Sequence, residues 1–224
     1  MGRDSDPRLQ QTQRRLGSPR PRGRLRFAVI AAIACGAVVL TALALRRAAP
    51  PLPVLGVVPA FALVASTDTP FTSADLTGQV WVADFIFTTC QGVCPRLSAQ
   101  MARLRDVLAR HGLNGVRLVS FSVDPHNDTP AALRDYAGRF HADPAHWVFV
   151  TGSREDLHAL IRDGFHVAVV EPPDAGGVIT HSEKFVLVDQ QAQIRGYYSA
   201  LDNEAFRQLL RDVGTLAAAG QRGR

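Results

Sequence analysis

The clearest signal for the fold of this chain is the segment Trp81-Val82-Ala83-Asp84-Phe85-Ile86-Phe87-Thr88-Thr89-Cys90-Gln91-Gly92-Val93-Cys94-Pro95. Its first seven residues are apolar apart from Asp84, as in a buried β-strand, and Pro95 fits the first turn of a helix. Cys90 and Cys94 therefore lie where a strand ends and a helix begins. The positive end of a helix dipole lowers the pKa of a thiol at that position. Such a pair can bind a soft metal ion or exchange electrons with another thiol pair.

The chain around and after this stretch predicts strands that alternate with helices. Helix patterns follow Pro95 as far as Gly112 and begin at Thr129, Ser153 and Asn203, which are residue types that cap helices. Apolar runs predict strands over Val80–Phe87, Val116–Val123, Trp147–Val150, Phe165–Val170, Lys184–Val188 and Ile194–Tyr198, the last two as a hairpin. This order indicates an α/β fold with a central sheet and helices on both faces. A thioredoxin-like fold places its reactive site where the cysteine pair stands, at the end of the first core strand.

A membrane anchor is predicted over residues 27–45, an uncharged run of mostly Ala, Val, Ile and Leu. At 1.5 Å per residue it spans roughly 28 Å, close to the thickness of the bilayer core. The basic tail before it, residues 1–26, holds eight arginines and two aspartates, and only Arg46 and Arg47 follow closely. The positive-inside rule therefore predicts a single-pass protein of the bacterial inner membrane, with its N-terminus cytoplasmic and its C-terminal domain periplasmic.

Two other interpretations of this run are weaker. A cleaved signal peptide usually has an apolar region of about 7–15 residues, which is shorter than this one. A lipoprotein cysteine at Cys35 would normally be followed by polar residues, whereas ten more apolar or small residues follow here. We expect an uncut anchor, then a proline-containing linker (46–60), a folded domain (61–216) and a frayed C-terminus (217–224).

The charge of the chain is divided unevenly. The whole sequence has a formal charge of +5, but the first 47 residues hold ten arginines and two acidic residues, and the remainder is mildly acidic. The basic tail is explained as a topology signal, so nothing in the composition suggests nucleic-acid binding.

The spacing of Cys90 and Cys94 leaves three uses open. On one face of a helix the two thiolates can share a metal ion, and with Cys90 in the loop they can close a redox-active disulfide. A thioredoxin-type redox pair is more often Cys-x-x-Cys, so the extra residue counts against an efficient oxidoreductase. A purely structural disulfide is the weakest choice, because so short a loop removes little chain entropy.

One histidine stands out as a third metal ligand. His181 lies in a glycine-containing segment that enters the predicted hairpin, and in a thioredoxin-like fold this entry faces the cysteines. It is either a ligand or a hydrogen-bonded hairpin histidine. His126 is a reserve candidate, and the other five histidines fit surface or structural roles. Two thiolates and one imidazole suit copper, Cu(I) especially, whereas structural zinc requires a fourth protein ligand.

At these residues the chain resembles the SCO/SenC family of membrane-anchored copper chaperones. The stretch from Asp84 to Pro95 is similar to the Cys-x-x-x-Cys-Pro motif of that family. Residues 122–130 resemble its second signature, with Asp-Pro and Asp-Thr-Pro elements. Thr180-His181-Ser182, followed by residues 185–189, resembles its histidine-bearing hairpin.

This resemblance implies a thioredoxin-like domain that binds one copper ion through Cys90, Cys94 and His181, with Asp124 in a supporting role. It implies delivery of copper to cytochrome c oxidase, chiefly to the CuA centre of subunit 2, or prior reduction of the cysteines of that subunit. A copper carrier of this kind is not an enzyme. The alternatives are a periplasmic thiol-disulfide oxidoreductase, which needs the cysteine pair but not His181, and a peroxiredoxin-like peroxidase, which leaves His181 without a role.

Overall fold

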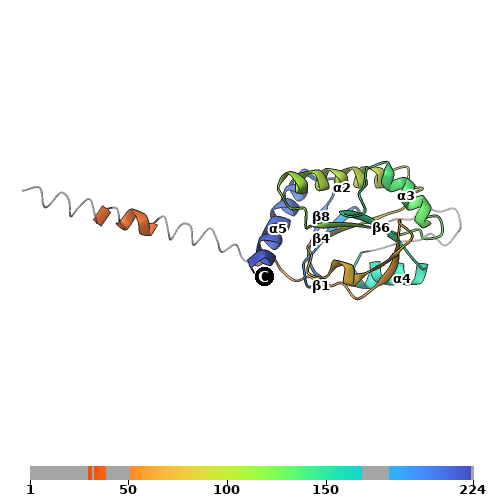
Figure 1. Cartoon of the computed structure of the whole chain (residues 1–224), viewed down its shortest axis with the longest axis horizontal. Coiled ribbons are helices and arrows are strands. Elements are labelled where there is room, and N and C mark those ends of the chain that lie inside the picture. The colour runs from red at the N-terminus through yellow and green to blue at the C-terminus, as the bar shows by residue number, and fades with distance from the viewer. Residues whose placement is uncertain (1–29, 32, 39–50, 168–181, 223–224) are drawn as a thin grey trace, which may run out of the picture. The chain divides into compact units, whose positions relative to one another are not determined.

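The computed structural model of the chain describes residues 30–31, 33–38, 51–167 and 182–222 (Figure 1). Two compact units are distinguished, Met1–Pro51 and Leu52–Arg224. In the first unit, the described residues between 30 and 38 are helical. All strands among the described residues belong to the second unit, which carries the cysteine pair.

The second unit contains strands and helices in the following order: β1 (Gly56–Val57), β2 (Ala62–Ala65), β3 (Pro70–Thr72), the 3-10 turn η2 (Ser73–Leu76), β4 (Trp81–Ile86), α2 (Val93–Arg110), β5 (Arg117–Ser122), α3 (Pro130–Gly138), β6 (Trp147–Thr151), α4 (Arg154–Ala159), the π-helical turn η3 (Leu160–Gly164), β7 (Lys184–Val188), β8 (Gln193–Ser199) and α5 (Asn203–Arg222). The strands form one sheet in the order β1-β8-β7-β4-β5-β6-β2-β3. β4, β5 and β6 are parallel, and the other pairs of neighbouring strands are antiparallel.

Alternating side chains of β4 divide the core between the two faces of this sheet. Val82 and Ile86 point to the face that α2, α3 and α5 cover, which we call the cysteine face because it includes the buried Cys94. Trp81, Ala83 and Phe85 point to the opposite face, where apolar side chains of α4 and η3 pack. In Figure 1, α2 and α3 lie on one side of the sheet and α4 on the other. The predicted α/β fold, with helices on both faces of a central sheet, is therefore confirmed.

The local predictions for the strand and helix ends are largely confirmed. Thr129 caps α3 by accepting a hydrogen bond from the N–H of Ala132, with Pro130 as the first helical residue. Ser153 caps α4 by accepting one from the N–H of Asp156. The hairpin of β7 and β8 forms as predicted. One cap is different: α5 begins at Asn203, but the Asp202 carboxylate accepts the hydrogen bond from the first turn.

The strand predicted over Phe165–Val170 is wrong for Phe165–Val167, which follow the π-helical turn without joining the sheet. Phe165 and Val167 are buried and His166 between them is exposed, with a backbone φ of 54°. These residues alternate between buried and exposed positions, as in a strand, but they form an irregular segment packed against the face of the sheet opposite the cysteines. Residues 168–170 lie outside the described residues.

The edges of the domain extend further than predicted. β1, β2 and β3 had no clear signal in the sequence, because they contain only two to four residues each. Residues 52–60, assigned to the linker, lie in the compact unit: β1 pairs with β8, and Val58 is buried. Arg195 fastens this segment by donating a hydrogen bond to the carbonyl of Leu52. At the other end, α5 continues through residues 217–222, which were expected to be frayed.

The predicted anchor falls mostly on residues outside the described set. Of residues 27–45, the structure describes 30–31 and 33–38. None of the helices in the described part of the chain combines the length and the apolar character that crossing a membrane requires. The anchor, the basic tail and the topology that follows from them stay predictions.

Candidate functional site

The cysteine pair lies at the carboxyl end of the central strand β4. The strand ends at Ile86, and α2 begins at Val93, so that Cys90 lies in the connecting loop and Cys94 in the first turn of the helix. The N–H of Cys90 donates to the carbonyl of Phe87 at 3.3 Å, which closes a turn. The N–H of Cys94 donates to the sulfur of Cys90 at 3.5 Å. No disulfide joins the two residues in this structure.

The two sulfurs have different environments. Cys94 is fully buried, whereas Cys90 is partly exposed. Burial would raise the pKa of the Cys90 thiol, but hydrogen bonds from Cys94 and from the backbone of Gly92 and Val93 outweigh it, so that the pKa lies below the usual value. Burial raises the pKa of the Cys94 thiol far above its usual value, and negative charge at Cys90 and Asp84 adds to this effect. Cys90 is therefore the thiol that ionises and reacts first.

A buried aspartate, Asp128, connects the cysteine loop to the loop after β5. One of its carboxylate oxygens accepts hydrogen bonds from the backbone N–H of Thr88 at 2.9 Å and from its hydroxyl at 2.6 Å. The other oxygen accepts from the Ser122 hydroxyl at 2.6 Å. Burial raises the pKa of Asp128, although the bonds from Ser122 and Thr88 oppose this, and the Asp124 charge raises it further. Sequence reasoning pointed to Asp124 and missed Asp128, although both lie in the second motif.

Asp124 lies in the same loop as Asp128, but its carboxylate binds a residue of that loop. Its carboxylate accepts a hydrogen bond from the side-chain amide of Asn127 at 2.7 Å. The described residues contain no group of three or more Cys, His, Asp or Glu side chains that could hold a metal ion. Neither Asp124 nor His126 is thus a third ligand beside the cysteines in this structure. A supporting role for Asp124 stays a prediction.

His181, the predicted third ligand, lies outside the described residues. The strand that follows it does lead to the cysteine end of the sheet. β7 runs antiparallel to β4 with Val186 opposite Ala83 and Val188 opposite Trp81. The first residue of β7, Lys184, therefore lies at the same end of the sheet as the last residues of β4.

The described histidines that the sequence assigned to structural roles keep such roles. His111 ends α2, and the glycine after it, Gly112, has a φ of 70° that favours glycine at this position. The ring of His146 lies 3.2 Å from the Asp143 carboxylate. The ring of His158 lies 3.1 Å from the carbonyl oxygen of Val123.

A second buried aspartate, Asp84, lies on the cysteine face of β4, between Val82 and Ile86 in the alternation. It has no exposed surface, and its Oδ1 accepts a hydrogen bond of 2.5 Å from the Ser120 hydroxyl. Burial raises the pKa of Asp84 to about 7, although the bond from Ser120 acts in the opposite direction. The sequence showed this residue as the one polar position in an apolar strand, which is the signal that could have identified it.

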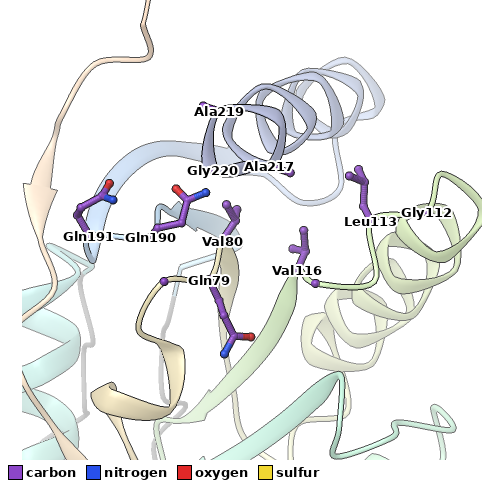
Figure 2. Close-up of a pocket in the computed structure, with 12 residues that line it drawn as sticks. Gln79, Val80, Gly112, Leu113, Val116, Gln190, Gln191, Ala217, Ala219 and Gly220 are labelled. Carbon is purple, nitrogen blue, oxygen red and sulfur yellow. The ribbon is translucent and has the colours of Figure 1, made fainter. Parts of the chain in front are cut away.

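A large hollow lies at the other end of the sheet. A cavity of about 540 Å³ is lined by the starts of β4 and β5, the β7–β8 turn and the end of α5. Figure 2 shows Gln190 and Gln191 from the turn facing Ala217, Ala219 and Gly220 of the helix. Its lining residues include no charged residue, cysteine or histidine. Ligand sites in open α/β sheets lie at the carboxyl ends of the strands, so the cysteine end remains the candidate site.

Comparison with known proteins identifies relatives over most of the second unit. The sequence model of the family described as SCO1/SenC matches residues 53–217. The SCO1 protein homolog of Bacillus subtilis is 34% identical over 139 residues, which cover 62% of this chain and 71% of the relative.

Two solved structures of relatives share this fold. A SCO1/SenC family lipoprotein from Bacillus anthracis is 35% identical, with a TM-score of 0.70, over 75% of this chain and 99% of the relative. BsSco, described as a member of the Sco family of cytochrome c oxidase assembly proteins with a disulfide switch, is 31% identical, with a TM-score of 0.66, over 75% of this chain and 97% of the relative. The likeness confirms the thioredoxin-like α/β fold predicted from the cysteine motif.

Proposed function

Because the chain belongs to the SCO1/SenC family, we propose that it is a copper chaperone for the assembly of cytochrome c oxidase. Copper is its cargo, one ion per chain, and Cys90, Cys94 and His181 are the ligands. The client is the CuA centre of subunit 2. The observation that carries this proposal is the pair of cysteines, without a disulfide between them, at the start of α2. BsSco, a 31% identical relative, is described as belonging to a family of cytochrome c oxidase assembly proteins.

The donor set suits Cu(I) as cargo. Thiolates are soft ligands that Cu(I) prefers, and the hydrogen bonds that hold the Cys90 sulfur also stabilise its thiolate. Cys94 is buried and the pKa of its thiol is raised, so copper binding at this sulfur displaces a proton that the thiol otherwise keeps at neutral pH. Copper binding therefore releases protons, and Cys90 makes the first contact.

His181 is proposed as the third ligand on two grounds. It stands three residues before β7, and the pairing of β7 with β4 brings the start of β7 to the cysteine end of the sheet. Two sulfurs alone leave a Cu(I) site open, and imidazole nitrogen is a suitable third donor. A ligand from a separate segment of the sequence can leave first, which gives the incoming thiolates of the client a position to occupy.

Hand-over then proceeds by ligand exchange. The client thiolates replace His181 first and the two cysteine sulfurs afterwards; His181 leaves as neutral imidazole, and each departing thiolate can take up a proton from solvent. No covalent bond of a substrate is made or broken, so we propose a carrier rather than an enzyme. We place it at the bacterial inner membrane, anchored by residues 27–45, with the domain in the periplasm.

The test is anaerobic loading of the reduced full chain, in mild detergent, with Cu(I). Metal analysis and competition with a Cu(I) chelator should give one tightly bound copper per chain. Cys90→Ser and Cys94→Ser should abolish tight binding, and His181→Ala should weaken it severely. His126→Ala, a change at an exposed histidine of the second motif, is the matched control and should leave the affinity unchanged. Absence of tight copper, or binding indifferent to His181, would contradict the proposal.

A second candidate function is thiol-disulfide exchange with client cysteines. The specific observation in its favour is the contrast between the accessible Cys90, with a lowered pKa, and the buried Cys94, with a raised one. In such an exchange, Cys90 attacks a client disulfide and Cys94 then displaces the client thiol, leaving the Cys90–Cys94 disulfide. Client reduction that survives His181→Ala, with no copper bound, would support this function instead.

A further inference from the structure

Thr88, two residues before Cys90, is held at both of its hydrogen-bond donors by one distant carboxylate. Its N–H and its hydroxyl both donate to the same oxygen of Asp128, which is 40 positions away in the sequence. Asp128 has no exposed surface and Thr88 is partly exposed, so water can approach these bonds from the Thr88 side only. A carboxylate that accepts several hydrogen bonds in a buried site fixes its partners more firmly than a neutral acceptor would.

The position of the Cys90 sulfur depends on the same turn. The N–H of Cys90 donates to the carbonyl of Phe87, so Thr88 and Thr89 form the middle of the turn that presents Cys90 to α2. The sulfur of Cys90 then accepts the N–H of Cys94. Releasing Thr88 would free this turn and let the sulfur move away from the start of the helix.

Asp128 also organises the loop after β5. Its second oxygen accepts from the Ser122 hydroxyl, and the Ser122 oxygen accepts the N–H of Asp124 at 3.0 Å. The N–H of Asp128 donates to the carbonyl of Asp124 at 2.9 Å. The turn after β5 is closed by two of these bonds, from the N–H of Asp124 to Ser122 and from the N–H of Asp128 to Asp124. The bonds from Thr88 to the Asp128 carboxylate are not needed for that turn and instead hold the cysteine loop.

We propose that Asp128 is a positioning residue for the thiol site, acting through Thr88 on the placement of Cys90. Its carboxylate holds the loop after β4 in the one arrangement that keeps the Cys90 sulfur against the α2 N-terminus, beside Cys94. The consequence for copper affinity rests on the proposed function, whereas the consequence for the reactivity of Cys90 does not.

The test compares four variants in the full chain, reduced, in mild detergent, with Cys35→Ser as the common background. Asp128→Asn removes the charge and one acceptor, and Thr88→Val removes only the hydroxyl donor. Thr88→Ser keeps that donor and is the rescue variant. Asp75→Asn is the matched control, because Asp75 accepts the N–H and the hydroxyl of Thr72 in the same way, at 2.7 and 2.9 Å, but at an exposed site.

Three quantities are measured on each variant: the Cu(I) dissociation constant by chelator competition, the rate at which iodoacetamide alkylates Cys90 at one pH, and the midpoint of unfolding. Asp128→Asn should weaken copper binding roughly tenfold to a hundredfold, the usual range for a residue that orients a ligand. It should also slow the alkylation of Cys90. Thr88→Val should act in the same direction, and Thr88→Ser and Asp75→Asn should match the parent.

A lower unfolding midpoint with copper affinity and alkylation rate both unchanged would overturn the proposal, because Asp128 would then be only structural. If the parent binds no copper, the proposed function fails, and the alkylation rates decide: a slower rate in Asp128→Asn supports positioning, and an equal rate overturns it. If Asp128→Asn does not fold, the comparison of Thr88→Val with Thr88→Ser decides in the same way.

Discussion

The Ser120 hydroxyl donates a 2.5 Å hydrogen bond to Oδ1 of Asp84 on the cysteine face of the sheet. The Ser120 oxygen in turn accepts the indole N–H of Trp147 at 2.9 Å. Within the described residues, Oδ2 of Asp84 is buried and has no hydrogen-bond partner. A carboxylate with an unpartnered buried oxygen is costly, and this explains why burial raises the pKa of Asp84 to about 7.

Asp84 should make stability depend on pH between about 4 and 7. In the unfolded chain its pKa is near 3.8, so over this interval the unfolded chain loses the proton and the folded chain keeps it. The free energy of unfolding of the parent should therefore fall relative to Asp84→Asn as pH rises, by at most about 1.4 kcal/mol per pH unit, and level off above the folded pKa. Urea unfolding of both proteins across this range measures the difference; a constant difference would contradict the assignment.

The two cysteines of the pair should differ in reactivity. Cys90 is partly exposed with a lowered pKa, and Cys94 is buried with a raised pKa. Iodoacetamide at neutral pH should modify Cys90 roughly tenfold or more faster than Cys94, because the thiolate is the reacting form. Peptide mass spectrometry after short exposures measures both rates. The denatured chain is the control, and equal rates in the folded chain would show that the burial difference is wrong.

The ion pair of Arg195 and Asp189 should contribute more to stability than the surface pair of Arg207 and Glu204. The Asp189 carboxylate is 2% exposed and receives Arg195 at 2.8 Å, whereas both members of the surface pair are at least 60% exposed. Arg195→Met should destabilise the domain by about 3 kcal/mol, because it leaves a buried charge without its cation and frees the carbonyl of Leu52. Arg207→Met, the matched control, should cost less than about 1 kcal/mol. Denaturant unfolding measures the free energy of unfolding of both variants, and similar decreases in the two would refute the prediction.

Oxidation should switch copper binding off. Forming the Cys90–Cys94 disulfide removes two electrons and two protons from the thiols, and the disulfide sulfurs are no longer thiolate ligands. A chain oxidised with a mild disulfide reagent should retain no tight Cu(I), and reduction should restore it. His181→Ala treated in the same way separates loss of the thiolates from loss of the imidazole. Copper bound equally to the oxidised chain would exclude the cysteines as ligands.

Within the second motif, residues 122–130, the sequence predicts a supporting role for Asp124 and contains no local signal that singles out Asp128. The hydrogen bonds show that Asp128 reaches the cysteine loop and that Asp124 is held by its neighbour Asn127. Both are aspartates in one polar turn, and only the path of the chain after β5 determines which carboxylate points toward Thr88.

The α/β fold, the position of the cysteines between β4 and α2, and the caps at Thr129 and Ser153 could all be predicted from the amino-acid sequence. These features depend on local chemistry, because periodicity, proline and capping residues act over a few positions. Tertiary structure alone decided that the short strand β1 joins β8, that Asp128 holds Thr88, and that Cys90 and Cys94 differ in burial. These relations join residues far apart in the chain or depend on exclusion of water, and both arise only when the sheet and helices pack together.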